Sequence, residues 1–306
     1  MTEIKNLVII GSGPAGLSCA IYAARCGIEP IIVAGDTPGG LLTKTDMVEN
    51  YPGFNSINGG DLMVKMLNQA ESLGTSFIYE TVEQIEKMSN GTFKIALSDG
   101  NFLFSKTVLI STGSNHKNLE IPGEKEYSNK GVSWCATCDG PMYRNKKVAV
   151  VGGGNTAVME ALFLSNFADT VYLIHRRNTF RAEKVVADRV ISNTKIKIFW
   201  NSIVQEIHGE ERVNSISLKQ DNSIEKTFLE VDGVFIAIGV YPMSHIFKNI
   251  VELDEEGYII ADNSVTSCKG VFAAGDVVSG SLKQAIYAAG QGALASYKIE
   301  KYLGIR

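Results

Sequence analysis

Short apolar runs alternate with helical patterns along this chain of 306 residues. Residues 6–10 form the first apolar run, residues 11–16 a glycine-rich turn, residues 17–26 an apolar helical pattern and residues 30–34 a second apolar run. Buried strands that alternate with helices are typical of parallel sheets. The pattern therefore predicts a β-α-β unit at the start of the chain.

A second copy of this pattern follows 141 residues after the first. Residues 147–174 again have the pattern of a strand, a glycine-rich turn, a helix and a return strand. The internal lengths match, so that Asp36, near the tip of the first unit's second strand, aligns with Arg177 in the repeat. We therefore expect two related units whose strand tips differ in charge.

Three more apolar runs end at or near glycine, at residues 108–113, 234–239 and 271–276. Each of the first two lies where it would add a strand to the preceding β-α-β unit. The third comes after the second unit is complete, so we expect it to join another sheet, most simply the first. Residues 77–104 and 195–229 alternate between apolar and polar positions in the manner of antiparallel strands.

The predicted fold is α/β, with two Rossmann-like dinucleotide-binding domains that combine parallel sheets with small antiparallel β-meanders. One domain is inserted in the other, with crossings near residues 114–119 and 239–247. The outer, discontinuous domain would consist of residues 1–116 and 245–306, and the inserted domain of residues 117–244.

Composition and charge narrow the function classes. The 29 basic and 33 acidic residues give a net charge of −4, and a chain without a basic excess is a poor candidate for non-specific nucleic-acid binding. No run reaches the ~18 apolar residues of a membrane span. Only residues 1–5 precede the first strand, so we expect no signal peptide. Five cysteines, an odd number, argue against a secreted disulfide framework, and a cytoplasmic location is expected.

The two glycine-rich turns are candidate pyrophosphate sites. Residues 11–16 match the spacing G-x-G-x-x-G, and residues 152–157 match G-x-G-x-x-A. A pyrophosphate requires close backbone approach without a Cβ in the way and free N–H groups at a helix N-terminus. One such match is weak evidence, whereas two, each between a strand and a helix, predict two dinucleotide sites.

The tips of the second strands discriminate between nucleotides. His175, Arg176 and Arg177, followed by Arg181, form a basic cluster in the second unit. Arginines at this place bind a 2′-phosphate, so the cluster predicts NADP recognition. Asp36 in the first unit suits a nucleotide without that phosphate, and the adenosine end of FAD is the obvious candidate.

Asp276 follows Gly275 directly after an apolar run. A carboxylate at the end of a strand can hold a ribityl hydroxyl. Lys283, Gln284 and Ala285 are expected to begin a helix of small residues, whose N-terminus could stabilise negative charge on a reduced flavin. A Gly-Asp pair is also a common turn, so this interpretation depends on the other motifs.

Cys135 and Cys138 form a C-x-x-C pair, which is half of a zinc site or a complete redox disulfide. Zinc needs two more ligands, but Cys19 and Cys26 fall in the first predicted helix and Cys268 is isolated. The four histidines show no ligand spacing. We therefore expect no metal, and a disulfide that exchanges electrons with a flavin.

Asp139 adjoins Cys138 and is a candidate general acid for a leaving thiolate. The alternative is that Asp139 is only a turn residue before Gly140. Ala136 and Thr137, between the cysteines, are small and leave the disulfide accessible.

Together, these motifs resemble those of the low-molecular-weight thioredoxin reductases of bacteria, archaea, fungi and plants. In larger disulfide reductases the redox pair lies near the first glycine turn, whereas here it lies just before the second, as in the low-molecular-weight class. The resemblance extends along nearly the whole chain and is carried by residues 11–16, 39–40, 49–53, 112–113, 135–140, 152–157, 175–184 and 270–277.

The resemblance implies a homodimeric flavoprotein that passes electrons from NADPH to FAD, then to Cys135 and Cys138, and finally to oxidised thioredoxin. Asp139 would be the acid, and which sulfur faces the flavin stays open. The inserted NADPH-binding domain would rotate against the FAD-binding domain about residues 115–118 and 240–244.

By the same resemblance, many residues would contact the two cofactors. FAD would contact Gly11, Ser12, Gly13, Pro14, Ala15, Gly16, Gly40, Leu41, Leu42, Asn50, Val82, Thr112, Gly113, Asp276, Lys283, Gln284 and Ala285. NADPH would contact Gly154, Asn155, Thr156, His175, Arg176, Arg177, Arg181, Ile238 and Gly239.

The chain departs from the family pattern at several positions. Ala34 and Met159 stand where Glu is common, Leu41 where Gln is common, Lys283 where Arg is usual, and residues 141–142 where an aromatic pair is frequent. The last change bears on the choice of protein partner. A related flavoprotein that reduces a peroxiredoxin-type partner or oxidises a small dithiol is therefore an alternative, and a redox sensor without turnover is another.

Overall fold

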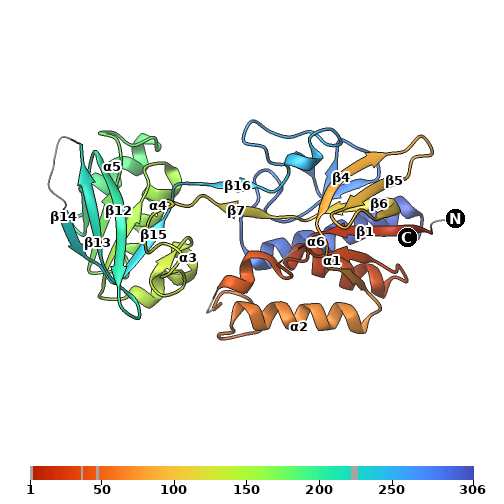
Figure 1. Ribbon diagram of the computed structural model, residues 1–306, viewed down its shortest axis with the longest axis horizontal. Helices are drawn as coiled ribbons and strands as arrows, with labels where there is room; N and C mark the ends of the chain where they lie inside the picture. Colours follow the sequence, from red (N-terminus) through yellow and green to blue (C-terminus); the bar gives the residue numbers. More distant parts are fainter. Residues whose placement is uncertain (1–2, 36, 46–47, 222–226) are drawn as a thin grey trace. The chain divides into compact units, whose positions relative to one another are not determined.

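The computed structural model describes residues 3–35, 37–45, 48–221 and 227–306 (Figure 1). The chain divides into two compact units, one made of Met1–Asn115 and Tyr241–Arg306 and the other of His116–Val240. We call them unit 1 and unit 2. The sequence analysis expected the second crossing near residues 239–247 and placed the domain boundary between residues 244 and 245. Met243 belongs to unit 1 because its N–H donates to the Gly113 carbonyl at 3.0 Å and its carbonyl accepts from the Thr112 hydroxyl at 2.6 Å.

Unit 1 is built on one nine-stranded sheet with the order β17-β18-β19-β6-β1-β2-β3, to which β5 and then β4 are added beside β6. The strands are β1 (Ile4–Ile10), β2 (Ile31–Val33), β3 (Ser76–Ile78), β4 (Val82–Lys87), β5 (Phe93–Leu97), β6 (Phe102–Ile110), β17 (Ala261–Asp262), β18 (Val265–Thr266) and β19 (Val271–Ala273). The strands from β19 to β3 pair in parallel, and β4 and β5 pair antiparallel. The expectation that the third late apolar run joins the first sheet is confirmed, because β19 pairs with β6.

The two faces of this sheet carry separate cores, as the alternation of side chains along a strand requires. Leu7 and Ile9 of β1 pack with helices α1 (Pro14–Arg25), α2 (Gly59–Ser72) and α6 (Ala285–Leu303). Val8 and Ile10 pack in the second core with β4, β5 and Phe247. Two short 3₁₀ helices, η1 (Gly40–Lys44) and η3 (His245–Phe247), complete the unit.

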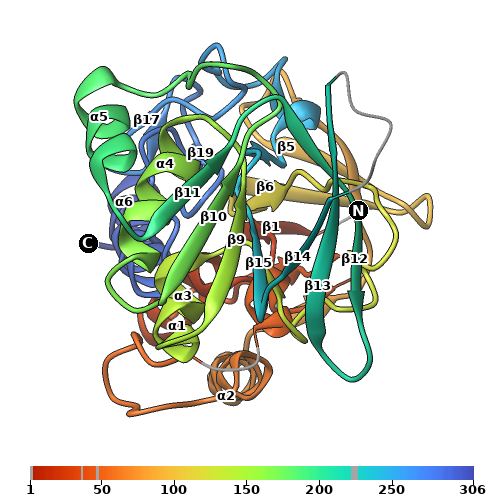
Figure 2. The same cartoon turned by 90° about the vertical axis from the view of Figure 1, so that its left-hand side faces the viewer.

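Unit 2 has a parallel sheet of order β11-β10-β9-β15-β8 and a three-stranded antiparallel sheet β12-β13-β14 (Figure 2). The strands are β8 (Val132–Ser133), β9 (Lys147–Val151), β10 (Thr170–Ile174), β11 (Ile196–Phe199), β12 (Ser202–Gly209), β13 (Val213–Gln220), β14 (Thr227–Glu230) and β15 (Gly233–Ile236). The helices are α3 (Ala136–Asp139), η2 (Gly140–Tyr143), α4 (Asn155–Leu164) and α5 (Lys184–Ser192). Val148 and Val150 of β9 pack with the helices, and Ala149 and Val151 with the antiparallel sheet.

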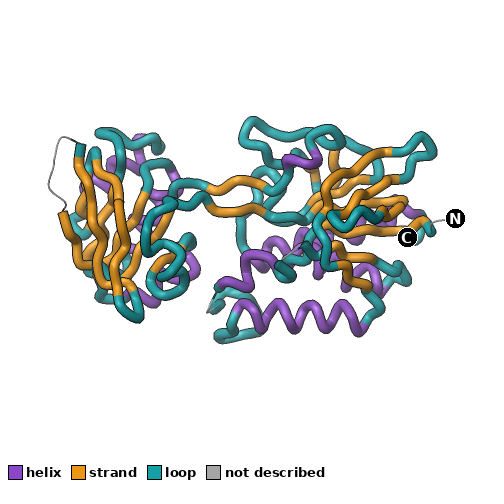
Figure 3. The backbone as a smooth tube through the Cα atoms, in the orientation of Figure 1, coloured by secondary structure: helices purple, strands orange, loops and turns teal. Residues whose placement is uncertain are grey.

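The chain passes between the units through two paired strands, β7 (Ser114–His116) and β16 (Val240–Pro242) (Figure 3). The Lys117 N–H extends this pairing by donating to the Gly239 carbonyl at 2.9 Å. Both crossings therefore share one short ribbon. Within the described ranges, no helix is long and apolar enough to cross a membrane.

Candidate active site

The glycine turn of unit 1 leaves the N-terminus of α1 open. Gly13 is the N-cap of α1 and Pro14 its first residue. A Cβ on Gly16 would lie 2.0 Å from the Gly11 carbonyl oxygen, so the turn closes tightly on the helix. A Cβ on Gly13 would meet no atom within 4 Å. Free N–H groups beside open space are the structure that a pyrophosphate requires.

A second segment of unit 1 lies against this turn. The Ser12 hydroxyl accepts a hydrogen bond from the Gly39 N–H at 3.0 Å and donates to the Ala34 carbonyl at 3.1 Å. A Cβ on Gly40 would lie 3.9 Å from the Cα of Gly13. Ser12 therefore holds the start of η1 beside the open turn, and Leu41 and Leu42 follow in the same 3₁₀ helix.

The carboxyl end of β19 reaches the same place. A Cβ on Gly275 would lie 3.1 Å from the Ala15 side chain of α1. Asp276 therefore follows a residue whose backbone lies close to α1. Gly275 itself is held by its N–H, which donates to Gln291 Oε1 at 2.8 Å. Burial raises the pKa of Asp276, and the Lys283 charge opposes that rise. The carboxyl group is thus in a partly dehydrated position where it can accept from a ligand hydroxyl.

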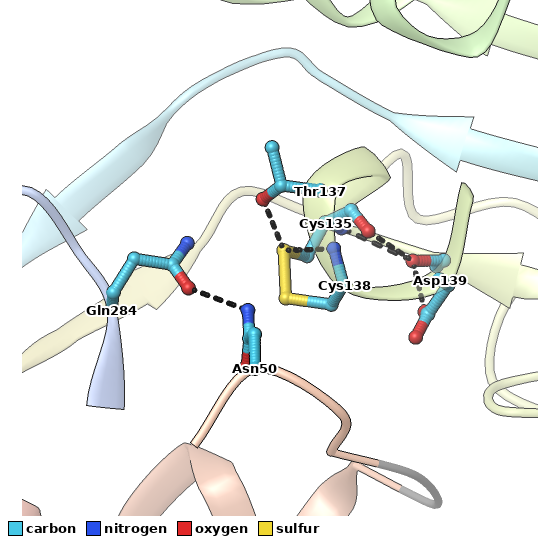
Figure 4. Close-up of a disulfide and its surroundings, with 7 residues drawn as sticks. Asn50, Cys135, Thr137, Cys138, Asp139 and Gln284 are labelled. Carbon is cyan, nitrogen blue, oxygen red and sulfur yellow. Dashed lines mark hydrogen bonds between the residues drawn. A yellow bond between two sulfur atoms is a disulfide. The ribbon is translucent and has the colours of Figure 1, made fainter. Parts of the chain in front are cut away.

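Lys283 lies outside α6, so the expectation that the helix begins with this residue is wrong. Lys283 has a φ of +58°, and the helix begins at Ala285 after the N-cap Gln284. A residue in the left-handed region cannot be part of the helix. The Lys283 ammonium donates to the Tyr258 hydroxyl at 2.9 Å. Asn50, another predicted FAD contact, donates to Gln284 Oε1 at 3.1 Å (Figure 4).

The remaining predicted FAD contacts are more dispersed within unit 1. Val82 begins β4 and packs against the second core of the sheet. Thr112 uses its hydroxyl to bind the Met243 carbonyl, and the following Gly113 has a φ of +70°. Asp36 lies outside the described residues.

The glycine turn of unit 2 has the same open helix N-terminus. Gly154 is the N-cap of α4, and a Cβ there would meet nothing within 4 Å. Gly152, with a φ of +151°, lies so close to the end of β15 that a Cβ would be 2.4 Å from the Ala237 carbonyl oxygen. Ile238 and Gly239 follow β15 and therefore lie near this turn. The sequence analysis expected both residues to contact NADPH.

The arginine loop folds over this turn. The Arg181 N–H donates to the Gly153 carbonyl at 2.7 Å, and the Asn155 side chain accepts from the Glu183 N–H at 2.8 Å. Asn155 and Thr156 are the first residues of α4. The side chains of Arg176, Arg177 and Arg181 are exposed. These two hydrogen bonds, one to a backbone carbonyl and one to a side-chain oxygen, hold the loop and its three exposed cations close to the N-terminus of α4.

His175, expected to contact the nucleotide, is buried beneath this loop. A Cβ on Gly153 would lie 2.1 Å from His175 Nδ1, so the ring lies directly on the turn. Its Nε2 donates to the Thr179 carbonyl at 2.9 Å. Burial, reinforced by the arginine charges, lowers the pKa of His175. The neutral ring therefore supports the loop that carries the arginines.

Cys135 and Cys138 form a disulfide at the start of α3 in unit 2 (Figure 4). Cys135 is the N-cap of this helix, and its sulfur accepts from the Cys138 N–H at 3.2 Å. The Thr137 hydroxyl lies 3.2 Å from the same sulfur. Two polar hydrogens are thus directed at one atom of the disulfide, and both would stabilise negative charge on Cys135.

Asp139 is held beside the disulfide by a residue that the sequence analysis missed. Ser133 is buried, and its hydroxyl donates to Asp139 Oδ2 at 2.6 Å while it accepts from the Cys135 N–H at 3.1 Å. One hydroxyl thereby connects the carboxylate to the backbone of the first cysteine. The only signal in the sequence was a serine two residues before the pair.

Comparison with known proteins identifies the family. Residues 5–292 match the pyridine nucleotide-disulphide oxidoreductases. The chain belongs to this family. A thioredoxin reductase from Rickettsia felis is 44% identical over 309 residues, and the match covers 99% of each chain. The predicted resemblance to thioredoxin reductases is therefore confirmed.

Two solved relatives confirm the predicted fold class of this oxidoreductase. A thioredoxin reductase from Streptococcus pyogenes is 38% identical, covers 99% of both chains and superposes with a TM-score of 0.95. One from Lactococcus lactis, in what is called its FR conformation, is also 38% identical and covers 98% of this chain and 99% of that chain, but its TM-score is 0.67. The two relatives thus match this chain equally in sequence and superpose on it to different extents.

A second carboxyl group of this oxidoreductase, also missed by the sequence analysis, lies next to the disulfide helix. Burial raises the pKa of Glu160 in α4 to about 7, and interaction with the Ala136 N–H opposes that rise. Its Oε2 is buried and has no hydrogen-bond partner among the described residues. The preceding Met159 is 59% exposed. A lone Glu in an apolar helical pattern gave no sign that it faces the redox pair.

Proposed function

We propose that this oxidoreductase is an NADPH-dependent flavoprotein that passes electrons from NADPH through FAD and the Cys135–Cys138 disulfide to oxidised thioredoxin. The observation that carries the proposal is the position of this disulfide in unit 2, shortly before β9 and the glycine turn over which the arginine loop folds. This order of elements is the one that distinguishes the low-molecular-weight thioredoxin reductases from larger disulfide reductases. The thioredoxin reductases among its relatives support the substrate.

FAD would be held in unit 1. The open N-terminus of α1 at Gly13 accommodates a pyrophosphate, since no atom occupies the space that a Cβ would take. Gly40 would border the same phosphates, and Asp276 would accept hydrogen bonds from ribityl hydroxyls. Lys283 would bring a cation to this end of the site, and its attachment to Tyr258 keeps the ammonium in place.

NADPH would be held in unit 2. The N-terminus of α4 at Gly154 would receive the pyrophosphate, and Arg176, Arg177 and Arg181 would bind the 2′-phosphate. His175 would act as a positioning residue, because its neutral ring packs on Gly153 and accounts for the conformation of the loop. When bound, the two cofactors supply a hydride and a carrier that delivers electron pairs to the disulfide.

The protein's own groups would manage charge at the disulfide. Reduction leaves one sulfur as a thiolate, and the Cys138 N–H and Thr137 hydroxyl would stabilise that charge on Cys135. Asp139, oriented by Ser133, would hold or release the proton of the other sulfur. The reduced pair would then attack the disulfide of the protein substrate through a mixed disulfide.

Stopped-flow absorbance tests this proposal on the purified protein. NADPH should bleach a yellow protein faster than NADH does, and oxidised thioredoxin should restore the colour with sustained NADPH consumption. A colourless protein, or one that NADPH does not bleach, would contradict the cofactor assignment. Turnover with small disulfides or a peroxiredoxin-type protein, but not with thioredoxin, would favour the alternative substrates; bleaching without any turnover would indicate a redox sensor.

Rotation of unit 2 about the two crossings is part of the proposal, because one disulfide must meet both a flavin and a protein in solvent. Lys117→Pro removes the N–H that donates to Gly239, whereas Lys117→Ala keeps it. We expect the proline variant to slow turnover with thioredoxin more than flavin reduction by NADPH. Equal slowing of both would count against rotation.

A further inference from the structure

The seam between α3 and α4 combines close apolar packing with one buried carboxyl group. Ala136 of α3 and Ala157, Ala161 and Leu164 of α4 are fully buried and share one core. Gly140, just after α3, lies so close to α4 that a Cβ there would be 3.1 Å from the Leu164 side chain. Glu160 lies on the same side of α4, since residues three and four apart in a helix share a face.

Glu160 has few partners in this seam. Interaction with the Ala136 N–H, the amide next to Cys135, opposes the rise in its pKa, and Glu160 makes no ion pair within the described part of the chain. Its Oε2 is buried and has no hydrogen-bond partner there. An acceptor oxygen without a donor favours the protonated form of a buried carboxyl group, because that form carries no charge and can itself donate.

Neighbouring charges are not the cause of the raised pKa of Glu160. The elements that pack against α4 carry these titratable or charged residues: Cys135, Cys138 and Asp139 at α3, Tyr143 of η2, Lys147 of β9, Tyr172 of β10, and Lys184, Asp188 and Arg189 of α5. The pKa of Glu160 has two causes, burial and the Ala136 hydrogen bond, and neither is a charged neighbour. A new charge at the disulfide would therefore be the main electrostatic change that this carboxyl group meets.

We propose that Glu160 takes up a proton when the Cys135–Cys138 disulfide is reduced. Cys135 and Glu160 flank this seam, because Ala136, the residue after Cys135, is buried in one core with Ala157 and Ala161, the α4 residues close to Glu160 in sequence. A thiolate at the start of α3 places a second negative charge near the buried carboxylate, and two like charges in a low dielectric do not both persist. Proton uptake keeps the net charge of the seam unchanged.

A dithiol can supply the electrons and protons for this reduction. The donor loses two electrons and two protons and closes its own disulfide, while the bond between the Cys135 and Cys138 sulfurs breaks. One proton goes to one sulfur, which becomes a thiol, and the other goes to the Glu160 carboxylate. The second sulfur stays a thiolate. Above pH 7, where the Glu160 carboxyl group of the oxidised protein is mostly ionised, and with the charge of Asp139 unchanged, the site begins with one negative charge on Glu160 and ends with one on sulfur.

Carbon-13 NMR of the full-length protein, labelled at the glutamate carboxyl carbons, measures this step directly. The Glu160 resonance is identified as the one that Glu160→Gln removes, and Glu160→Asp serves the same purpose if the glutamine variant does not fold. We expect a titration midpoint near pH 7 in the oxidised protein. After reduction with dithiothreitol, the midpoint should rise by at least about one pH unit, a tenfold gain in proton affinity. An identical midpoint in both states overturns the proposal.

A second measurement gives the pH at which the reduced cysteine pair forms its thiolate. The rate of alkylation by iodoacetamide as a function of pH gives the pH at which the thiolate forms. Glu160→Gln removes the competing charge and keeps an acceptor oxygen for the Ala136 N–H, so its profile should shift to lower pH by about one unit. Glu211→Gln, which changes an exposed carboxylate of the same unit, should match the wild type. Coincident profiles for wild type and Glu160→Gln would also overturn the proposal.

The inference rests on the redox use of this disulfide in the proposed function, but its tests do not depend on the cofactors. Dithiothreitol opens the disulfide without NADPH or thioredoxin. A failure of the stopped-flow experiment would therefore leave these results interpretable, and a failure here would leave the electron path intact.

Discussion

The two glycine turns share one design and differ in what surrounds it. In unit 1 the third position must be glycine, because a Cβ on Gly16 would lie 2.0 Å from the Gly11 carbonyl oxygen. In unit 2 the equivalent Ala157 is fully buried in the helix core. Both turns open a helix N-terminus at the middle glycine, Gly13 or Gly154. The common part is thus the open helix N-terminus, and the tolerance at the third position depends on how closely the helix approaches the turn.

The helices behind the turns differ more strongly. In unit 1, α1 packs against α6 so closely that a Cβ on Gly292 would lie 2.0 Å from the Ala15 carbonyl oxygen. In unit 2, α4 packs against the four-residue helix that bears the disulfide, with Glu160 in the seam. The helix after the unit 1 turn therefore packs on the long helix α6, whereas the helix after the unit 2 turn packs on the helix that bears the disulfide. The comparison predicts that thiol chemistry and its proton coupling belong to unit 2 alone.

Cys138→Ser should have the largest effect. Removal of one member of the reactive pair should lower the rate of electron transfer to thioredoxin by at least ~10⁴-fold, the scale seen when a covalent catalytic group is deleted. Cys268→Ser, a change of a free cysteine in unit 1, should leave the rate within a factor of two or so of the wild type. The measurement is steady-state NADPH oxidation with thioredoxin. Parental speed in Cys138→Ser would refute the assignment of the redox pair.

Exchange of the third turn residues should separate the two turns by stability. Gly16→Ala forces a methyl group against the Gly11 carbonyl and should cost about 3 kcal/mol or more, together with loss of bound flavin. Ala157→Gly removes a buried methyl group from a helix and should cost about 1–2 kcal/mol. Denaturant unfolding followed by circular dichroism measures both. Equal costs would show that the turns do not differ as described.

Glu160 should make the stability of unit 2 fall as pH rises. Burial raises its pKa from an ordinary 4.5 to about 7, so the folded chain binds this proton more tightly than the unfolded chain. The stabilisation is complete below pH 4.5 and is lost as pH rises to 7. Relative to Glu160→Gln, the oxidised wild type should lose roughly 2 kcal/mol of unfolding free energy between about pH 5 and 8. Parallel pH profiles for the two proteins would contradict this.

Replacement of Arg176 or Arg177 should have the smallest effect among these four predictions. Arg176→Ala and Arg177→Ala should each weaken NADPH about tenfold relative to NADH, since a charge-assisted hydrogen bond contributes about 1.5–3 kcal/mol and part of it is screened at an exposed site. Arg189→Ala, at the exposed end of α5, provides the control. The readout is the ratio of KM values for the two coenzymes. An unchanged ratio in both variants would reject the assigned role.

Local patterns were enough to predict most of the fold. The apolar runs and glycine turns predicted β1, α1 and β2, and their repeat predicted β9, α4 and β10. The position of β19 beside β6 followed from chain order, because the second unit was already complete. The start of α6 was placed two residues early, since nothing in the sequence shows that Lys283 takes a left-handed conformation.

The amino-acid sequence by itself determined the two glycine turns, the arginine loop and the cysteine pair, because each is a short run of residues whose chemistry depends on local spacing. Only the tertiary structure decided the surroundings of that pair. Ser133 is joined to Asp139 across the start of α3, His175 lies on Gly153, and Glu160 of a separate helix buries a carboxyl oxygen that has no partner among the described residues. These side chains act through burial and through contacts between elements, and no spacing along the chain records which faces will meet.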